Sequence, residues 1–167
     1  MLKDEDRIFK NLYNDLGWDI DSAVKEGDWS QTKDFISKGK NWIINEVKES
    51  YKLSNSKICL SGFSQGCMMS INIGLTSDEN FNCIVGFSGK IIDKNNLAKR
   101  ISSTTKMLLL HGDKDAVVPS SNLLDAKDFL LRNKIEVETK MINDCDHHIP
   151  IKASSIALSY LKKNFSI

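Results

Sequence analysis

The sequence predicts an α/β fold in which a mostly parallel sheet is flanked by helices. Short apolar runs of the length typical for buried strands recur along the chain, and segments with helical spacing of apolar residues separate them. Alternating strands and helices are typical of parallel sheets joined by right-handed crossovers. The chain has 167 residues, of which 41% are hydrophobic, and this is the size of one domain. We therefore expect a single domain over residues 1–167.

The N-terminal part carries two helical patterns. Residues 8–16 place apolar side chains at helical spacing and end at Gly17, and we expect residues 1–30 to form an irregular or helical segment. Ser30 is suited to cap a second, amphipathic helix that reaches to about residue 51, with lysines and glutamates opposite its apolar face.

The remaining elements follow in alternation. Three runs are short and mainly apolar, as expected for strands buried on both faces, whereas a fourth alternates apolar and polar residues, as at the margin of a sheet. The predicted strands cover residues 57–61, 83–87, 107–110 and 135–142, and the predicted helices cover about 65–76, 120–133 and 150–164.

Charge and cysteine content exclude several classes of protein. Lys and Arg number 23 and Asp and Glu number 22, so nucleic acid and anionic membranes are not expected as partners. No segment approaches the roughly 20 apolar residues of a membrane span, and the charged N-terminus does not resemble a secretory signal. The 4 cysteines lack a Cys-x-x-Cys pair, so we expect reduced thiols, no bound metal and a cytoplasmic location.

One motif carries nucleophile chemistry. Residues 62–66 read Gly-Phe-Ser-Gln-Gly and match the Gly-x-Ser-x-Gly nucleophile elbow, in which a sharp strand-to-helix turn lifts the serine hydroxyl clear of the sheet. An apolar strand is predicted before the motif and a helix after it, as the elbow requires. Ser64 is therefore the candidate nucleophile, and the backbone N–H of Gln65 is a candidate oxyanion donor.

A serine hydroxyl needs a base, and the chain has only 3 histidines. His111 follows the strand at 107–110 directly and precedes every acid of the next loop, so it fits poorly as the base. His147 and His148 follow the last predicted strand and precede the last helix, where the base of this fold belongs. One of these two should serve.

The acid is expected in the loop after residues 107–110. This loop contains Asp113 and Asp115, and Asp115 is the better candidate because Asp113 lies in a Gly-Asp-Lys sequence where its side chain is expected to close a turn. Ser88 lies in a Gly-Phe-Ser-Gly sequence that resembles the elbow only in part, and it is expected to end a strand. A cysteine nucleophile, Cys67 or Cys145, is the remote alternative because neither occupies the centre of the elbow.

The stretch from Ser61 to the C-terminus contains the segments GFSQG, HGDKDAVVP and DHHIP. With these segments it resembles the phospholipase/carboxylesterase family of α/β-hydrolases, which includes the acyl-protein thioesterases. The resemblance implies an α/β-hydrolase fold and a cofactor-free serine esterase that cleaves carboxylic esters or thioesters. It places the catalytic triad on Ser64, Asp115 and His147. Asp146 stands where the family has glycine, and Cys67 replaces the usual second glycine after the elbow serine.

The same resemblance indicates that the N-terminal strands of the fold are lacking, together with the loop that supplies a second oxyanion donor. An alternative is therefore a catalytically impaired hydrolase fold that acts as a binding or assembly module. Loss of those strands would leave the elbow strand at a bare sheet edge, which favours a homodimer through that edge or coverage by residues 1–30.

Overall fold

The computed structural model describes residues 21, 34, 37–38 and 42–166. Contacts within the chain group it into two units, Met1–Val47 and Lys48–Ile167. The helix predicted over residues 8–16 lies outside the described residues, as does nearly all of residues 1–30. Of the second predicted helix, the structure describes chiefly its C-terminal end, α3 (Trp42–Tyr51).

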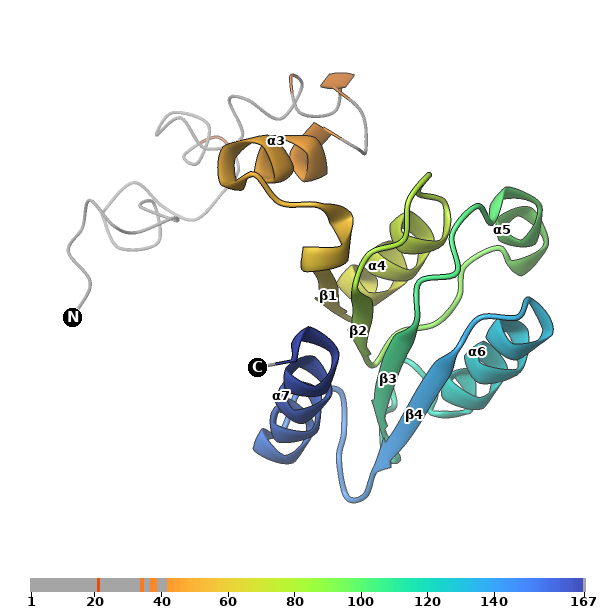
Figure 1. The fold of residues 1–167 in the computed structure, drawn as a ribbon. Coiled ribbons are helices and arrows are strands. Elements are labelled where there is room, and N and C mark those ends of the chain that lie inside the picture. Colours follow the sequence, from red (N-terminus) through yellow and green to blue (C-terminus); the bar gives the residue numbers. More distant parts are fainter. Residues whose placement is uncertain (1–20, 22–33, 35–36, 39–41, 167) are drawn as a thin grey trace. The chain divides into compact units, whose positions relative to one another are not determined.

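The unit Lys48–Ile167 contains a four-stranded sheet with the order β1-β2-β3-β4, and every neighbouring pair is parallel (Figure 1). The predicted parallel sheet is thus confirmed. The strands are β1 (Cys59–Phe63), β2 (Cys83–Phe87), β3 (Met107–Gly112) and β4 (Val137–Ile142).

Helices cover both faces of this sheet. In Figure 1, α4, α5 and α6 lie on one side of the strands and α7 lies on the other. Three of these helices were predicted at nearly the same bounds, whereas α5 was not predicted. The helices are α4 (Gln65–Leu75), α5 (Lys94–Arg100), α6 (Ser121–Arg132) and α7 (Ile151–Phe165).

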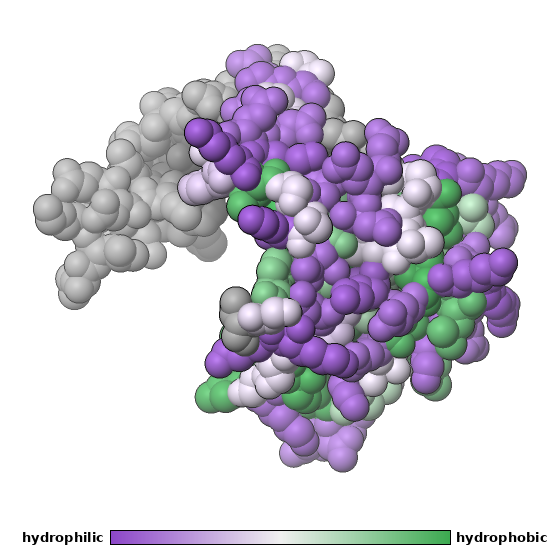
Figure 2. All heavy atoms as spheres, in the orientation of Figure 1, coloured by the Kyte–Doolittle hydropathy of each residue, from purple (hydrophilic) through white to green (hydrophobic). Residues whose placement is uncertain are grey.

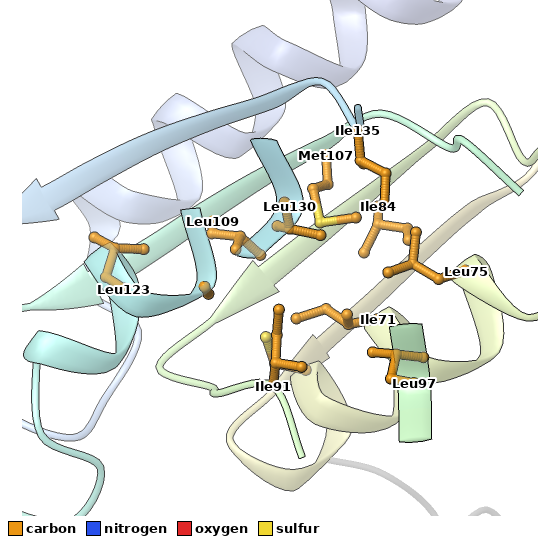
Figure 3. Close-up of a cluster of buried hydrophobic side chains, with 12 residues drawn as sticks. Ile71, Leu75, Ile84, Ile91, Leu97, Met107, Leu109, Leu123, Leu130 and Ile135 are labelled. Carbon is orange, nitrogen blue, oxygen red and sulfur yellow. The ribbon is translucent and has the colours of Figure 1, made fainter. Parts of the chain in front are cut away.

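Alternate residues of each strand divide between two hydrophobic clusters, one on each face. On the α4–α6 side, Ile84 and Leu109 meet apolar side chains of the three helices, and the labelled side chains in Figure 3 point toward one another. On the other side, Val85 and Leu110 pack against Ala157 of α7. The carboxyl ends of all four strands therefore lie at one edge of a sheet that is fixed from both faces.

Three strands differ from their predicted bounds, and the fourth strand of the chain begins at Val137 rather than at residue 135. The first begins at Cys59 rather than residue 57 because Asn55–Lys57 form a turn of 3-10 helix that uses the Ile58 N–H as a donor to the Asn55 carbonyl. The third continues to Gly112, so His111 belongs to a strand and not to the acid loop. Both residues of that extension pair with β4, at Met141 and Ile142.

Strand β1 is apolar, yet it is only half-buried. Cys59, Leu60 and Phe63 are all intermediate in exposure, whereas every residue of β2 is buried. Within the described part of the chain, β1 pairs with β2 alone. At the opposite edge, the first four residues of β4 alternate between half-buried and exposed, as expected for a sheet margin, and the strand ends at the buried Ile142.

The visible surface is mostly hydrophilic, with hydrophobic side chains gathered in small separate areas (Figure 2). Within residues 42–166, no helix has the length and apolar character needed to cross a membrane.

Candidate active site

Ser64 lies at the turn between β1 and α4, in a backbone conformation that few residues other than glycine adopt. Its φ is 53° and its ψ is −116°, and its N–H donates to the Phe87 carbonyl at 2.8 Å. A Cβ on Gly62 would lie 2.2 Å from the carbonyl carbon of Gly66, so this turn excludes a side chain there. A Cβ on Gly66 would meet no described atom within 4 Å. Only the first glycine of the motif is sterically required.

The structure brings three of the residues predicted to form the site together at the carboxyl edge of the sheet. His147 Nε2 lies 3.1 Å from Ser64 Oγ, and His147 Nδ1 lies 2.7 Å from Asp115 Oδ2. Ser64 follows β1, Asp115 follows β3 and His147 follows β4. The separations and the atoms involved match those of a serine hydroxyl, an imidazole and a carboxylate aligned for proton transfer.

Phe63 supports the imidazole and was missed by the sequence analysis. Its ring centroid lies 4.7 Å from that of His147, with the two planes tilted by 42°. A contact of this kind restricts ring rotation. In the sequence, only the position of Phe63 directly before Ser64 could have indicated that it lies near the site.

The Asp115 side chain is buried, and both of its carboxylate oxygens have hydrogen-bond partners. Its Oδ1 accepts the N–H groups of Val117 at 3.0 Å and Val118 at 2.8 Å, and its Oδ2 faces His147. Burial raises the pKa of the Asp115 carboxyl, but hydrogen bonds from His147 and from the two backbone N–H groups outweigh burial, so this pKa lies below its ordinary value. The carboxylate is therefore charged, and its charge faces His147.

The loops that carry Asp115 and His147 are hydrogen-bonded to each other. Asp113 Oδ1 accepts the Cys145 N–H at 3.2 Å, and the Lys114 N–H donates to the Cys145 carbonyl at 2.9 Å. A Cβ on Gly112 would lie 2.2 Å from that carbonyl oxygen, so glycine is needed for the two loops to approach. Asp113 thus bonds the neighbouring loop, and its prediction as a residue that closes its own turn was wrong.

The two other histidines lie apart from Ser64 in different settings. His148 is exposed, and its Nδ1 bonds the Asp146 carboxylate, the residue that replaces the family's glycine. His111 is buried in β3, and its Nε2 lies 2.8 Å from the Val118 carbonyl oxygen.

The remaining nucleophile candidates are buried. Burial raises the pKa of the Cys67 thiol to about 12, and it also raises the pKa of Cys145. The Cys67 sulfur fills a notch left by two glycines, since a Cβ on Gly86 or Gly89 would lie 2.4 Å from it. This space accommodates the Cys67 side chain, which is larger than the glycine that the family usually has at this position. Ser88 follows β2, as predicted, and is 2% exposed.

The Gln65 N–H is the first of α4, and the opening N–H groups of a helix have no acceptor within it. It lies next to Ser64 in the chain, where an oxyanion donor is required. Within residues 42–166 and the few described before them, no group of three His, Cys, Asp or Glu side chains is placed to hold a metal ion.

Comparisons with known proteins agree with this architecture. A model of the phospholipase/carboxylesterase family matches residues 12–165. Among solved structures, esterase PE8 is 30% identical with a TM-score of 0.70, and the match covers 71% of this chain and 55% of that one. Acyl-protein thioesterase 2 of Zea mays is 23% identical with a TM-score of 0.60, over 65% of this chain and 56% of that one. The fold is therefore that of the α/β-hydrolases, and the chain spans little more than half the length of these two relatives.

A curated relative of a different kind matches a short segment. The 51 kDa subunit of the mitochondrial NADH-ubiquinone oxidoreductase of Aspergillus niger is 57% identical over 49 residues, which are 29% of this chain and 10% of that protein. The chain thus spans about a tenth of that relative. A match of 49 residues cannot contain both Ser64 and Asp115, which lie further apart than that in the sequence.

Proposed function

Because the chain belongs to the phospholipase/carboxylesterase family, we propose that it is a serine hydrolase of carboxylic esters or thioesters that acts through Ser64, Asp115 and His147. The observation that carries this proposal is the continuous series of contacts from Ser64 Oγ through both nitrogens of His147 to Asp115 Oδ2, at 3.1 and 2.7 Å. Solved esterases and an acyl-protein thioesterase share its fold.

In the proposed reaction, His147 Nε2 takes the Ser64 hydroxyl proton while Oγ attacks the acyl carbon. Asp115 holds the proton on Nδ1, so that Nε2 is free to accept, and its charge stabilises the imidazolium that forms. The tetrahedral intermediate collapses, His147 gives its proton to the leaving alcohol or thiol, and Ser64 retains the acyl group. Water, deprotonated by His147, then attacks this acyl-enzyme. As the second tetrahedral intermediate collapses, His147 returns the proton to Ser64 Oγ and the acid is released.

The Gln65 N–H would stabilise the negative oxygen of both tetrahedral intermediates. Removal of one oxyanion donor costs about 3 to 4 kcal/mol, whereas enzymes lower barriers by roughly 8 to 23 kcal/mol. A site with Gln65 as its single donor would therefore hydrolyse activated esters slowly but measurably.

The proposal is tested by hydrolysis of p-nitrophenyl acetate. Ser64→Ala should reduce the rate to the background without enzyme, since loss of a triad serine costs about a millionfold. Ser88→Ala, at the other strand-end serine, is the matched control and should retain the wild-type rate. Equal rates for wild type and Ser64→Ala would refute a role for Ser64.

We also propose that two copies of the chain associate through the edge of β1 at which no described strand pairs. Cys59, Leu60 and Phe63 give this edge an apolar character on both faces of the sheet, and such an edge favours pairing with another strand. Sedimentation at rising concentration should show a dimer, and fast amide exchange in Cys59–Phe63 of a strictly monomeric protein would contradict it.

We propose a cytoplasmic location because the cysteines are free thiols. All 4 cysteines are free, as expected in a reducing compartment. Fractionation of cells that express the tagged chain tests this location, and recovery with an oxidising compartment would overturn it.

A further inference from the structure

We propose that His111 is a positioning residue that fixes the Asp115 carboxylate for its contact with His147. The inference rests on the proposed function, since it concerns the acid of the same site. It starts from the buried imidazole of His111 at the carboxyl end of β3, a residue that was expected to follow this strand and not to lie within it.

The ring of His111 lies among apolar side chains. Its side chain is 1% exposed, and it lies two residues after Leu109, so it faces the same side of the sheet as the cluster of α4, α5 and α6. A buried imidazole that makes no hydrogen bond destabilises the fold, so its polar atoms require partners.

The partners of His111 belong to the loop of Asp115. Nε2 lies 2.8 Å from the Val118 carbonyl oxygen and 3.3 Å from Asp115 Oδ2. Both of these atoms are acceptors, so Nε2 carries a proton. His111 therefore donates to the Val118 carbonyl, and the same nitrogen lies against the oxygen of Asp115 that contacts His147.

These contacts form a closed ring. Val118 donates its N–H to Asp115 Oδ1 at 2.8 Å and accepts from His111 with its carbonyl. The carboxylate is held at Oδ1 by its own loop and is bounded at Oδ2 by two imidazoles. In this arrangement the carboxylate accepts the Val118 N–H at Oδ1 while Oδ2 reaches His147, and the His111 ring lies against Oδ2.

Phenylalanine at position 111 would remove the donor and put a somewhat larger apolar ring in its place. The Val118 carbonyl would lose its partner, and the Asp115 side chain would gain freedom to rotate away from His147. In metal sites, loss of a residue that orients a ligand costs about 10- to 100-fold in affinity or activity, and we expect an effect of this order for a residue that orients the Asp115 carboxylate. The effect should appear in kcat, because His111 does not reach the space where substrate meets Ser64.

The test compares His111→Phe with His111→Gln, which can still donate, and with Leu109→Val, a packing change on the same strand and face. His111→Leu replaces the phenylalanine variant if the larger ring prevents folding. We expect the apolar variant to lower kcat for p-nitrophenyl acetate about 10- to 100-fold with KM within about twofold, and His111→Gln to recover most of the loss. Leu109→Val should leave kcat within about twofold.

A second measurement does not depend on turnover. The proton between His147 Nδ1 and Asp115 should give a far-downfield ¹H NMR resonance, which His111→Phe shifts or broadens and Leu109→Val leaves in place. If wild type shows no esterase activity, the proposed function fails while this resonance still tests His111. An unchanged resonance and kcat in the apolar variant, or equal changes in Leu109→Val, would overturn the positioning role.

Discussion

His147 and Asp115 lie 32 positions apart in the sequence, yet Nδ1 of the first lies 2.7 Å from Oδ2 of the second. Their loops follow neighbouring parallel strands, β3 and β4, and hydrogen bonds through Cys145 hold the loops together. The contact is therefore a consequence of the sheet topology. It orients the only histidine that touches Ser64 among the described residues.

Asp115→Asn should reduce kcat on the order of 10⁴-fold, because an amide favours the wrong tautomer of His147. Asp113→Asn is the matched control. It keeps an oxygen that can accept the Cys145 N–H, so kcat should stay within about threefold of wild type. Steady-state hydrolysis of p-nitrophenyl acetate measures both, and equal losses in the two variants would show that loop structure, not the carboxylate, is responsible.

Asp115 should also contribute to stability in a pH-dependent manner. Its pKa is lowered in the folded protein, so it stabilises the fold above its unfolded pKa of about 3.9, and this contribution is lost as the pH falls through the folded pKa. Urea unfolding at pH 7 and near pH 3 should therefore show a smaller loss of unfolding free energy in Asp115→Asn than in wild type. The same loss in both proteins would contradict the lowered pKa.

The two glycines of the elbow should respond oppositely to alanine. Gly62→Ala places a methyl group 2.2 Å from the Gly66 backbone and should destabilise the fold by about 1 to 3 kcal/mol. Gly66→Ala meets open space in the first turn of α4 and should be neutral or stabilising by up to about 1 kcal/mol. Urea unfolding gives both values, and a loss at Gly66 as large as that at Gly62 would contradict the described turn.

Thiol reagents should leave the activity intact. Burial raises the pKa values of Cys67 and Cys145, so neither forms an appreciable thiolate at pH 8. After treatment of the native protein with iodoacetamide, the hydrolysis rate should match the untreated rate. Loss of activity in step with alkylation of either cysteine would revive a cysteine nucleophile.

The sequence was sufficient to predict every element from β1 to α7 except one, because alternating apolar runs and helical patterns are strong local signals. It missed α5, a helix of 7 residues that depends on an Asp93 cap, with the Asp93 carboxylate accepting the Asn96 N–H at 3.2 Å. A segment so short has too few residues for a helical period to be recognised.

For the site, Ser64 was predicted from its motif. The position after the last strand predicted a base at His147 or His148, and the family resemblance favoured His147. The partners of Asp113 and His111 could not be predicted, because each bonds a residue that only the folded sheet brings near. Cys145 lies 32 positions from Asp113, and the Val118 carbonyl reaches His111 only because the loop turns back over the strand. Burial of a polar ring depends on packing, which local sequence does not reveal.

The most direct test of the central claim is reaction with a fluorophosphonate probe, followed by intact mass and peptide mapping. We predict one adduct per chain on Ser64, lost in Ser64→Ala, retained in Ser88→Ala and strongly slowed in His147→Gln. An unmodified mass after long incubation would contradict the account and would favour a hydrolase fold that binds or assembles without turnover.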